Sequence, residues 1–266
     1  MARSIKFTKA NESGKRAAAS AQSVVIRQPE QASIVLEVSG SADIIQNCFS
    51  QKAVEQILRK HMGFPNPREV KNPRQCIEWA TTRNTNGEVC IPPTAFKKGM
   101  LTAAMSMDDK SLKKTRLRTS MYVAGQSIPI TFTEMVPRMD ITRTSGMNHQ
   151  PDVRFRPAFI NWKARMEILF DPSTTKVQTV VDLLGRAGRV GVGEWRPEKD
   201  GTFGTYDVTR NIDDPKEIAE VRKQCAVALV ALRIPEWAMD ADIDPALLAK
   251  IAHGETEDGE SAVVGK

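Results

Sequence analysis

The chain has 266 residues, of which 41% are hydrophobic and 26% are charged, and its formal net charge at pH 7 is +6. These values are ordinary for a globular protein, and no apolar run approaches the roughly 20 residues that cross a bilayer. The basic N-terminal segment lacks the apolar stretch of a secretory signal, so we expect a cytoplasmic protein that does not enter a membrane.

Cysteine and histidine are too scattered to suggest a metal centre. The four cysteines lie far apart without a CxxC pair, and the three histidines are equally dispersed. Zinc sites need ligands paired at short spacing. We therefore expect reduced thiols without disulfides, and we expect no metal and no cofactor.

Charge is distributed unevenly along the chain. Residues 1–18 hold five Lys or Arg against one acidic residue, and residues 97–118 hold seven against two, whereas residues 236–260 are rich in acid. This polarity favours a nucleic-acid binder or an oligomer that associates head to tail. A solvated basic face without a ligand is the plainer alternative.

The first half of the chain alternates predicted strands and helices. Residues 1–30 predict a flexible basic arm. SIVLEVSGSADII (33–45) predicts a strand ending at Gly40, and NCFSQKAVEQILRKHMG (47–63) predicts a helix followed by a proline-punctuated loop. CIEWATTRNTNGEVCIP (76–92) predicts a hairpin that turns at Asn86-Gly87.

The middle of the chain begins with a predicted helix. PPTAFKKGMLTAAMSM (92–107) predicts a helix from about Thr94, because prolines precede a run of helix formers. KKTRLRTSMYVAGQSIPITF (113–132) predicts two strands around Gly125. Residues 134–158 are polar and irregular, and so long a loop in a compact domain is usually functional or disordered.

The second half repeats the pattern of a strand followed by a helix. FINWKARMEILFD (159–171) predicts one strand, Asp171 caps a helix over 173–188, and GTFGTYDVTR (201–210) predicts a final strand. Residues 215–235 and 244–252 are predicted to be helical, and residues 253–266 form an acidic, disordered tail.

This order of elements predicts an α+β protein. Two strand-helix halves that close on an antiparallel sheet make a ferredoxin-like or RRM-type fold with its helices on one face. We expect a single domain over residues 31–252, with insertions near 64–130 and 134–158.

Glycine and arginine alternate in LLGRAGRVGVGEWRPEKDGTFGTYD (183–207). The spacing is neither that of a P-loop nor that of a dinucleotide fingerprint, which opens a helix rather than following one. A glycine-rich turn after a helix explains the segment without a ligand. The functional reading is a basic backbone surface against phosphates, formed by Arg186, Gly188, Arg189, Gly191, Gly193 and Arg196.

Other candidate contacts are basic or aromatic. Trp162 is expected in the core, whereas Trp195 lies inside the basic segment and is as consistent with base stacking as with packing. A solvated face explains the remaining cations as well as phosphate binding does. These cations are Lys97, Lys98, Lys113, Lys114, Arg116, Arg118, Arg154 and Arg156.

A helix, a glycine-rich loop and a final strand resemble the signature of the RAMP superfamily of CRISPR-associated proteins. CIPPTAFKKGMLTAA is similar to the short motif that opens a helix in the backbone subunits of that family, through Ile91, Pro92, Thr94, Phe96, Lys98 and Gly99. The resemblance implies a protein that follows a guide RNA along a filament of copies beside other effector subunits. It also implies that residues 134–158 form a protruding thumb hairpin.

Four functions remain open from the sequence. The first is a non-catalytic protein that binds single-stranded RNA and assembles head to tail. The second is a single-stranded DNA-binding protein of a phage or mobile element, and the third is a virion assembly protein. An enzyme is the weakest reading, because Asp43, the aspartate that the resemblance places near a catalytic position, is better explained as the cap of the following helix.

Overall fold

The computed structural model describes residues 30–65, 70–107, 112–143 and 151–239, together with two short strands near the N-terminus. These strands, β1 (Ser4–Ile5) and β2 (Val24–Val25), pair antiparallel. Across the described residues, no helix is both long and apolar enough to cross a membrane. The acidic tail and the helix predicted over 244–252 lie outside the described residues, as does most of the basic arm.

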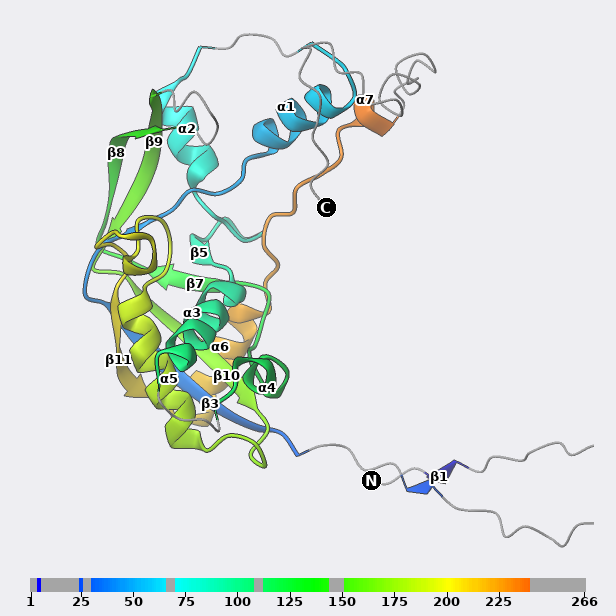
Figure 1. Ribbon diagram of the computed structural model, residues 1–266, viewed down its shortest axis with the longest axis vertical. Helices are drawn as coiled ribbons and strands as arrows, with labels where there is room; N and C mark the ends of the chain where they lie inside the picture. Colours follow the sequence, from blue (N-terminus) through cyan, green and yellow to red (C-terminus); the bar gives the residue numbers. More distant parts are fainter. Residues whose placement is uncertain are drawn as a thin grey trace, which may run out of the picture.

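A central antiparallel sheet organises the fold (Figure 1). β3 lies between β11 and β10, and β10 is followed by β6 and β7, with β5 beside β7. The α+β fold with antiparallel strands is confirmed. The strands are β3 (Ala32–Gly40), β5 (Cys90–Ile91), β6 (Met121–Val123), β7 (Ile128–Thr131), β10 (Lys163–Phe170) and β11 (Tyr206–Asn211).

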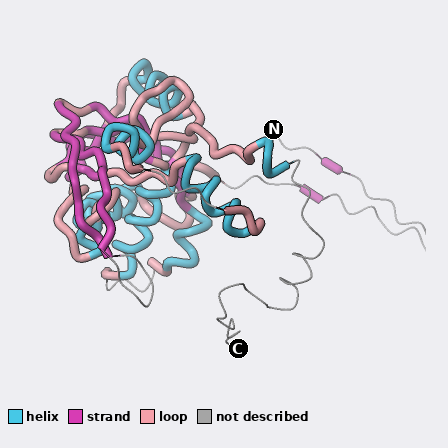
Figure 2. Tube along the Cα trace, turned by 90° about the horizontal axis from the view of Figure 1, so that it is seen from above, coloured by secondary structure: helices cyan, strands magenta, loops and turns pink. Residues whose placement is uncertain are grey.

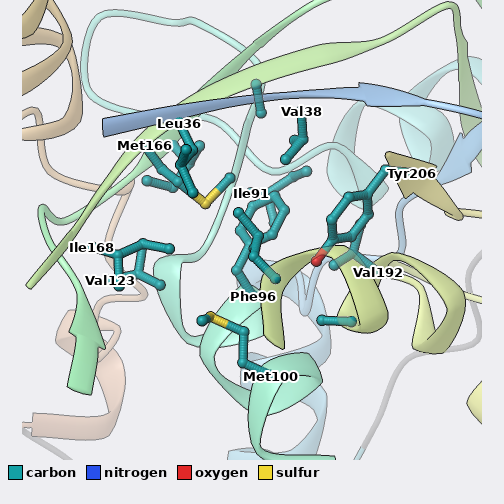
Figure 3. Close-up of a cluster of buried hydrophobic side chains, with 14 of the residues drawn as sticks. Leu36, Val38, Ile91, Phe96, Met100, Val123, Met166, Ile168, Val192 and Tyr206 are labelled. Carbon is teal, nitrogen blue, oxygen red and sulfur yellow. The ribbon is translucent and has the colours of Figure 1, made fainter. Parts of the chain in front are cut away.

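Two helices, α3 (Pro93–Met105) and α5 (Val177–Val190), pack against each other on one face of this sheet. Leu36 and Met166 are register partners, and Figure 3 shows them with Phe96 and Met100 in one apolar cluster. The rings of Phe96 and Tyr206 meet edge to face, 5.6 Å apart. Each such buried side chain contributes about 1.5–3 kcal/mol, so these contacts fix α3 and α5 to the sheet.

The helix α6 (Pro215–Cys225) covers the opposite face of the sheet. The sequence predicted helices on one face only. The strand residues on this face alternate with the core residues of β3 and β10. Arg222 of α6 pairs with Glu167 at 2.6 Å, and Glu217 pairs with Arg165 at 3.1 Å. The same carboxylate also pairs with Arg210 of β11. Ion pairs therefore hold α6 to the sheet.

The helix predicted over 47–63 is present, but the helix of the first half that packs on the sheet is α3. That segment does form α1 (Gln51–His61), but α1 has no buried residue and lies away from the sheet (Figure 1). The side chain of Ser50 accepts a hydrogen bond from the amide of Ala53, so Ser50 and not Asp43 caps this helix. The apolar spacing of α1 indicated a helix but could not show what it packs against.

The segment 76–92 is only half a hairpin. Its first part belongs to α2 (Pro73–Ala80), whose cap is Asn72. The turn at Asn86-Gly87 is confirmed, since Arg83 and Val89 form an antiparallel bridge around it. Pro73 at the first helical position and Asn72 before it were the helix signals that the hairpin prediction overlooked.

The described residues between 134 and 158 form two paired strands rather than an irregular loop. β8 (Glu134–Arg143) pairs with β9 (Pro151–Ile160) along its whole length, and β4 (Ile44–Ile45) pairs with the other side of β9. Figure 2 shows long strands side by side at one edge of the molecule. The strand predicted over 159–171 is interrupted at Asn161, whose φ of 51° lets β9 and β10 diverge.

Two further segments differ from expectation. The first part of 113–132 is the helix α4 (Lys114–Ser120), while the two strands around Gly125 are present. The predicted helix over 215–235 ends at Cys225, residues 228–235 are not helical, and the short helix α7 (Glu236–Met239) follows them. The amide of Val230 donates to the carbonyl of Arg83, so this segment bonds laterally instead of within a helix.

Candidate nucleic-acid interface

The outer side of α3, α4 and α5, here called the helical layer, carries a marked excess of positive charge. The acidic residue of these helices is Asp182, and its side chain is bonded to Gln178. The basic residues of the layer, including the cap of α4, are Lys97, Lys98, Lys113, Lys114, Arg116, Arg118, Arg186 and Arg189.

In the part of the chain that the structure describes, these cations differ from several others in having no carboxylate partner. Among the described residues, none of them forms an ion pair, although Lys97 donates to the carbonyl of Arg118. Arg116 acts at longer range on Asp171, whose pKa is lowered chiefly by hydrogen bonds from Ser173. On the opposite face, by contrast, Arg222 and Arg165 are both paired. The helical layer therefore has basic side chains that are available for an anion.

A cleft of about 1120 Å³ opens at one end of this layer. Its walls are residues 44–51, the end of α2 with the following residues, the first turns of α3, residues 191–198, and residues 229–236. We call residues 191–204 the glycine loop and residues 229–236 the C-terminal strap. The side chain of Gln51 bonds both the amide and the carbonyl of Arg233, which ties the strap to the start of α1.

The first turn of α3 lines this cleft, where Thr94 and Lys98 lie one turn apart. Pro92 and Pro93 have no N–H group, and the amide of Ala95 donates to the carbonyl of Pro92, so Thr94 supplies the amide of this turn that can bond an anion. The helix dipole also favours an anion at such an end. The predicted helix-opening motif therefore contributes to the cleft.

The glycines of 183–207 divide into two groups. Gly185 and Gly188 lie within α5, which extends to Val190 beyond its predicted end. A methyl group on Gly188 would lie 1.9 Å from the carbonyl oxygen of Tyr206, so this glycine lets α5 approach β11 closely. Gly188 is buried between α5 and β11, so the prediction that it lies on a phosphate-binding surface was wrong.

Gly191 and Gly193 belong to the glycine loop proper and line the cleft. Their φ angles of 79° and 81° lie in the region that favours glycine. A side chain on Gly193 would meet the carbonyl oxygen of Ile45 at 2.5 Å, and the amide of Glu194 bonds that oxygen at 2.9 Å. The loop is thus fastened to β4 while its other side faces the cleft.

The predicted arginines of this segment do not converge on one point. Arg196 lines the cleft, but its guanidinium pairs with Glu198 at 2.7 Å and donates to the carbonyl of Gly193. Arg186 and Arg189 are exposed on α5 and stand on the helical layer instead. Arg154 lies on β9, where it pairs with Asp152.

Arg156 and Trp195 were expected to contact nucleic acid, and the structure places them against each other. The side chain of Arg156 is 1% exposed, and its guanidinium carbon lies 5.4 Å from the centre of the Trp195 ring. Arg138 lies in the same way over Phe203, at 4.8 Å. These contacts join the hairpin to the glycine loop, so Arg156 is a packing residue and Trp195 is half-buried.

Several residues of the cleft were missed by sequence reasoning. Trp79 and Arg83 come from α2 and its continuation, and the strap was taken for a helix. Their charge is mixed rather than uniformly basic. The charged side chains that line the cleft are Lys98, Arg83, Arg196 and Arg233 with Glu78, Glu194, Glu198 and Glu236.

Asp43 lies in the turn between β3 and β4. Its carbonyl oxygen accepts a hydrogen bond from Gly204 at 2.7 Å, which ties this turn to the glycine loop. His61, in the last turn of α1, is not among the residues that line the cleft. In the part of the chain that is described, no three carboxylate, thiol or imidazole groups are grouped to hold a metal ion.

The chain matches no protein-family model and no curated protein. A solved structure similar to it is a chain of the type III-B Cmr-beta complex bound to cognate target RNA, with 8% identity and a TM-score of 0.44 over 68% of this chain and 60% of that one. Another is Cmr6 from Pyrococcus furiosus, with 10% identity and a TM-score of 0.34 over 68% and 100%. This chain thus spans about three fifths of the Cmr-beta chain.

Proposed function

We propose that this protein binds single-stranded RNA through its phosphate backbone and works as a RAMP-like subunit of a CRISPR-type effector complex. The main support for the proposal is the composition of the helical layer, which has eight basic residues and one acidic residue. Phosphates dominate the affinity of proteins for nucleic acid, and unpaired Lys and Arg side chains are what neutralises them.

The position of the cleft supports the same function. Lys98 belongs both to the helical layer and to the cleft, so a strand lying on the layer can continue into the cleft at the start of α3. The glycine loop follows α5 and precedes β11, which is the place that the resemblance to RAMP proteins implies for it. The same resemblance implies other effector subunits as partners.

Single-stranded DNA is the alternative ligand, because it offers the same phosphates. RNA differs by its 2′-hydroxyl, which both donates and accepts hydrogen bonds. The polar side chains of the cleft, such as Thr94 and Glu194, can bond such a hydroxyl. We therefore favour RNA over DNA.

The proposed role is binding without catalysis. A catalytic centre needs side chains grouped in a reactive geometry, such as a nucleophile held beside its base. In the turn that contains Asp43, the described contacts are structural: backbone bonds to Gly204 and Thr205 and a bond from the Trp162 ring to the carbonyl of Ala42. Incubation of labelled RNA with the protein and Mg²⁺ should leave the RNA intact, and cleavage that disappears in Asp43→Ala would contradict this role.

Copies of the protein are proposed to associate head to tail. β8 is the edge strand of its sheet, and its outward residues Met135, Met139 and Ile141 are 42%, 66% and 71% exposed. An exposed apolar edge strand pairs readily with another chain unless it is covered. A second copy is the proposed cover.

The test of RNA binding is fluorescence anisotropy with matched RNA and DNA oligonucleotides of about 12 nucleotides, a typical length for single-strand binding sites. We expect RNA to bind more tightly than DNA, with an affinity that falls steeply as salt rises. Binding of neither strand would refute the proposal. Tighter binding of DNA would favour the single-stranded DNA-binding protein.

A further inference from the structure

Aromatic side chains line the cleft as well as charged side chains of both signs. Trp79 of α2 and Phe49, which is 55% exposed, both line it. They face the same space as Lys98, Thr94 and the start of α3. This combination is complementary to a nucleotide: an aromatic ring can stack on the base, and a cationic side chain can bind the phosphate joined to it.

Trp79 is suited to stack on a base. Its side chain is half-buried in α2, which fixes it, and the ammonium of Lys52 lies 4.8 Å from the ring centre. Trp79 also lines a second cavity of about 320 Å³, together with Phe49, Phe155, Lys71 and Arg154. Trp79 therefore borders two cavities, and each has cationic side chains among its lining residues.

We infer that the cleft is a site for an unpaired nucleobase of the bound strand, with Trp79 as the stacking surface and with Lys98 and the amide of Thr94 binding the adjoining phosphate. This inference rests on the proposed binding of RNA and specifies how the strand is held. It makes the ligand a single strand by necessity, because a paired base has both faces stacked within its helix and cannot lie on Trp79.

Stacking and phosphate binding respond differently to salt, so the salt dependence of RNA affinity distinguishes the contribution of Trp79 from that of the helical layer. A stacked base contributes affinity without releasing counterions, so Trp79→Ala should leave the slope of log affinity against log salt unchanged. Its affinity for an RNA of about 12 uridines should fall by about 10-fold to 100-fold. Trp79→Phe should keep most of the affinity because it keeps an aromatic face.

The matched control is Trp237→Ala. Trp237 of α7 is also half-buried and also has a cation over its ring, since Arg59 lies 4.6 Å from the ring centre. It packs against Phe64 and is not among the residues of the cleft. We expect this variant to bind RNA like the natural protein, and thermal unfolding of both variants measures any loss of folding.

An abasic strand of the same length provides the decisive comparison. The natural protein and Trp79→Ala should bind it with affinities within about twofold of each other, because the base that Trp79 stacks is missing. Equal losses on the abasic and the uridine strands would overturn the inference and make Trp79 a structural residue. Unchanged binding of the uridine strand by Trp79→Ala would also overturn it.

The source of the base is tested with uridine monophosphate. If the site serves a strand, the mononucleotide should compete weakly, since it lacks the phosphates that reach the helical layer. Competition as strong as that of the strand would assign the cleft to a free nucleotide and overturn the inference. Failure of the natural protein to bind any strand would refute the proposed function itself. That outcome is distinct from unchanged RNA binding by Trp79→Ala, which would overturn only the role of Trp79.

Discussion

The guanidinium carbon of Arg156 lies 5.4 Å from the centre of the Trp195 ring, and this contact joins the hairpin to the glycine loop. Asp140 compensates the buried charge, 3.8 Å from Arg156 and 3.2 Å from Arg138. The Nε and Nη1 atoms of Arg156 have no hydrogen-bond partner among the described residues. Burial lowers the pKa of this guanidinium and opposes its charge.

Mutation of Asp140 and mutation of Arg156 should lower the free energy of unfolding by different amounts. Asp140→Ala leaves two arginines without their shared carboxylate and should lower the free energy of unfolding by about 3 kcal/mol. Arg156→Met removes a charge whose bonds are incomplete and should change it by less than about 1.5 kcal/mol. Chemical denaturation measures both. Equal losses would show that the hydrogen bonds of Arg156 are better satisfied than its surroundings indicate.

Gly188 and Gly185 offer a paired test of the helix that carries Arg186 and Arg189. Gly188→Ala should cost about 3 kcal/mol and lower Tm by about 6–12 °C, because the new methyl group meets the carbonyl oxygen of Tyr206 at 1.9 Å. The described residues leave open space around Gly185. Gly185→Ala should therefore raise stability by about 0.5–1 kcal/mol through helix propensity.

The ion pair between Glu167 and Arg222 makes stability depend on pH. The hydrogen bond from Arg222 lowers the pKa of Glu167 below its ordinary value of 4.5. A lowered folded pKa contributes stability above the unfolded value, and this contribution is lost as pH falls through the folded pKa.

Arg222→Ala should therefore cost more at about pH 7 than at about pH 4. The loss at neutral pH should be about 1 to 2 kcal/mol, since the side chain of Arg222 is 55% exposed and water replaces part of its interaction. Lys223→Ala, on the same helix, should change stability by less than about 0.5 kcal/mol. A loss independent of pH would contradict the role of the Glu167 charge.

Self-association should depend on the outward face of β8. Met139→Lys combined with Ile141→Lys places two charges on the apolar edge and should convert oligomers to monomers in analytical ultracentrifugation. The control is Val70→Lys combined with Val177→Lys, which adds the same charge at other exposed apolar positions. Oligomers that survive the β8 change but not the control would place the interface elsewhere.

Much of the fold could be predicted from the sequence because local patterns determine it. The alternation in β3, the helix formers after Pro92 and the final strand after the glycine loop each indicated their element. The failures came where contacts distant in sequence decide the structure. The polar hairpin β8–β9 is stabilised by full cross-strand pairing, and the strap is held by Arg83 and Gln51.

The candidate site shows the same division. Composition indicated the basic residues of the helical layer, since their charge needs no tertiary information. It could not indicate that Arg156 is buried in contact with Trp195, or that Trp79 lines the same cleft as the start of α3. These placements depend on the insertion between β4 and α3, whose position relative to the sheet no local pattern encodes.

The measurement that most directly tests RNA binding by the helical layer compares two pairs of charge removals. Arg186→Ala with Arg189→Ala alters the helical layer, whereas Lys216→Ala with Lys223→Ala removes the same charge from α6 on the opposite face. RNA affinity is measured at a series of salt concentrations for both. We predict that the first pair weakens binding and reduces the salt slope by about 1.4, as expected for two lost phosphate contacts on a single strand, while the second leaves both unchanged. Equal effects of the two pairs would show that net charge rather than this face binds RNA, and would contradict the proposal.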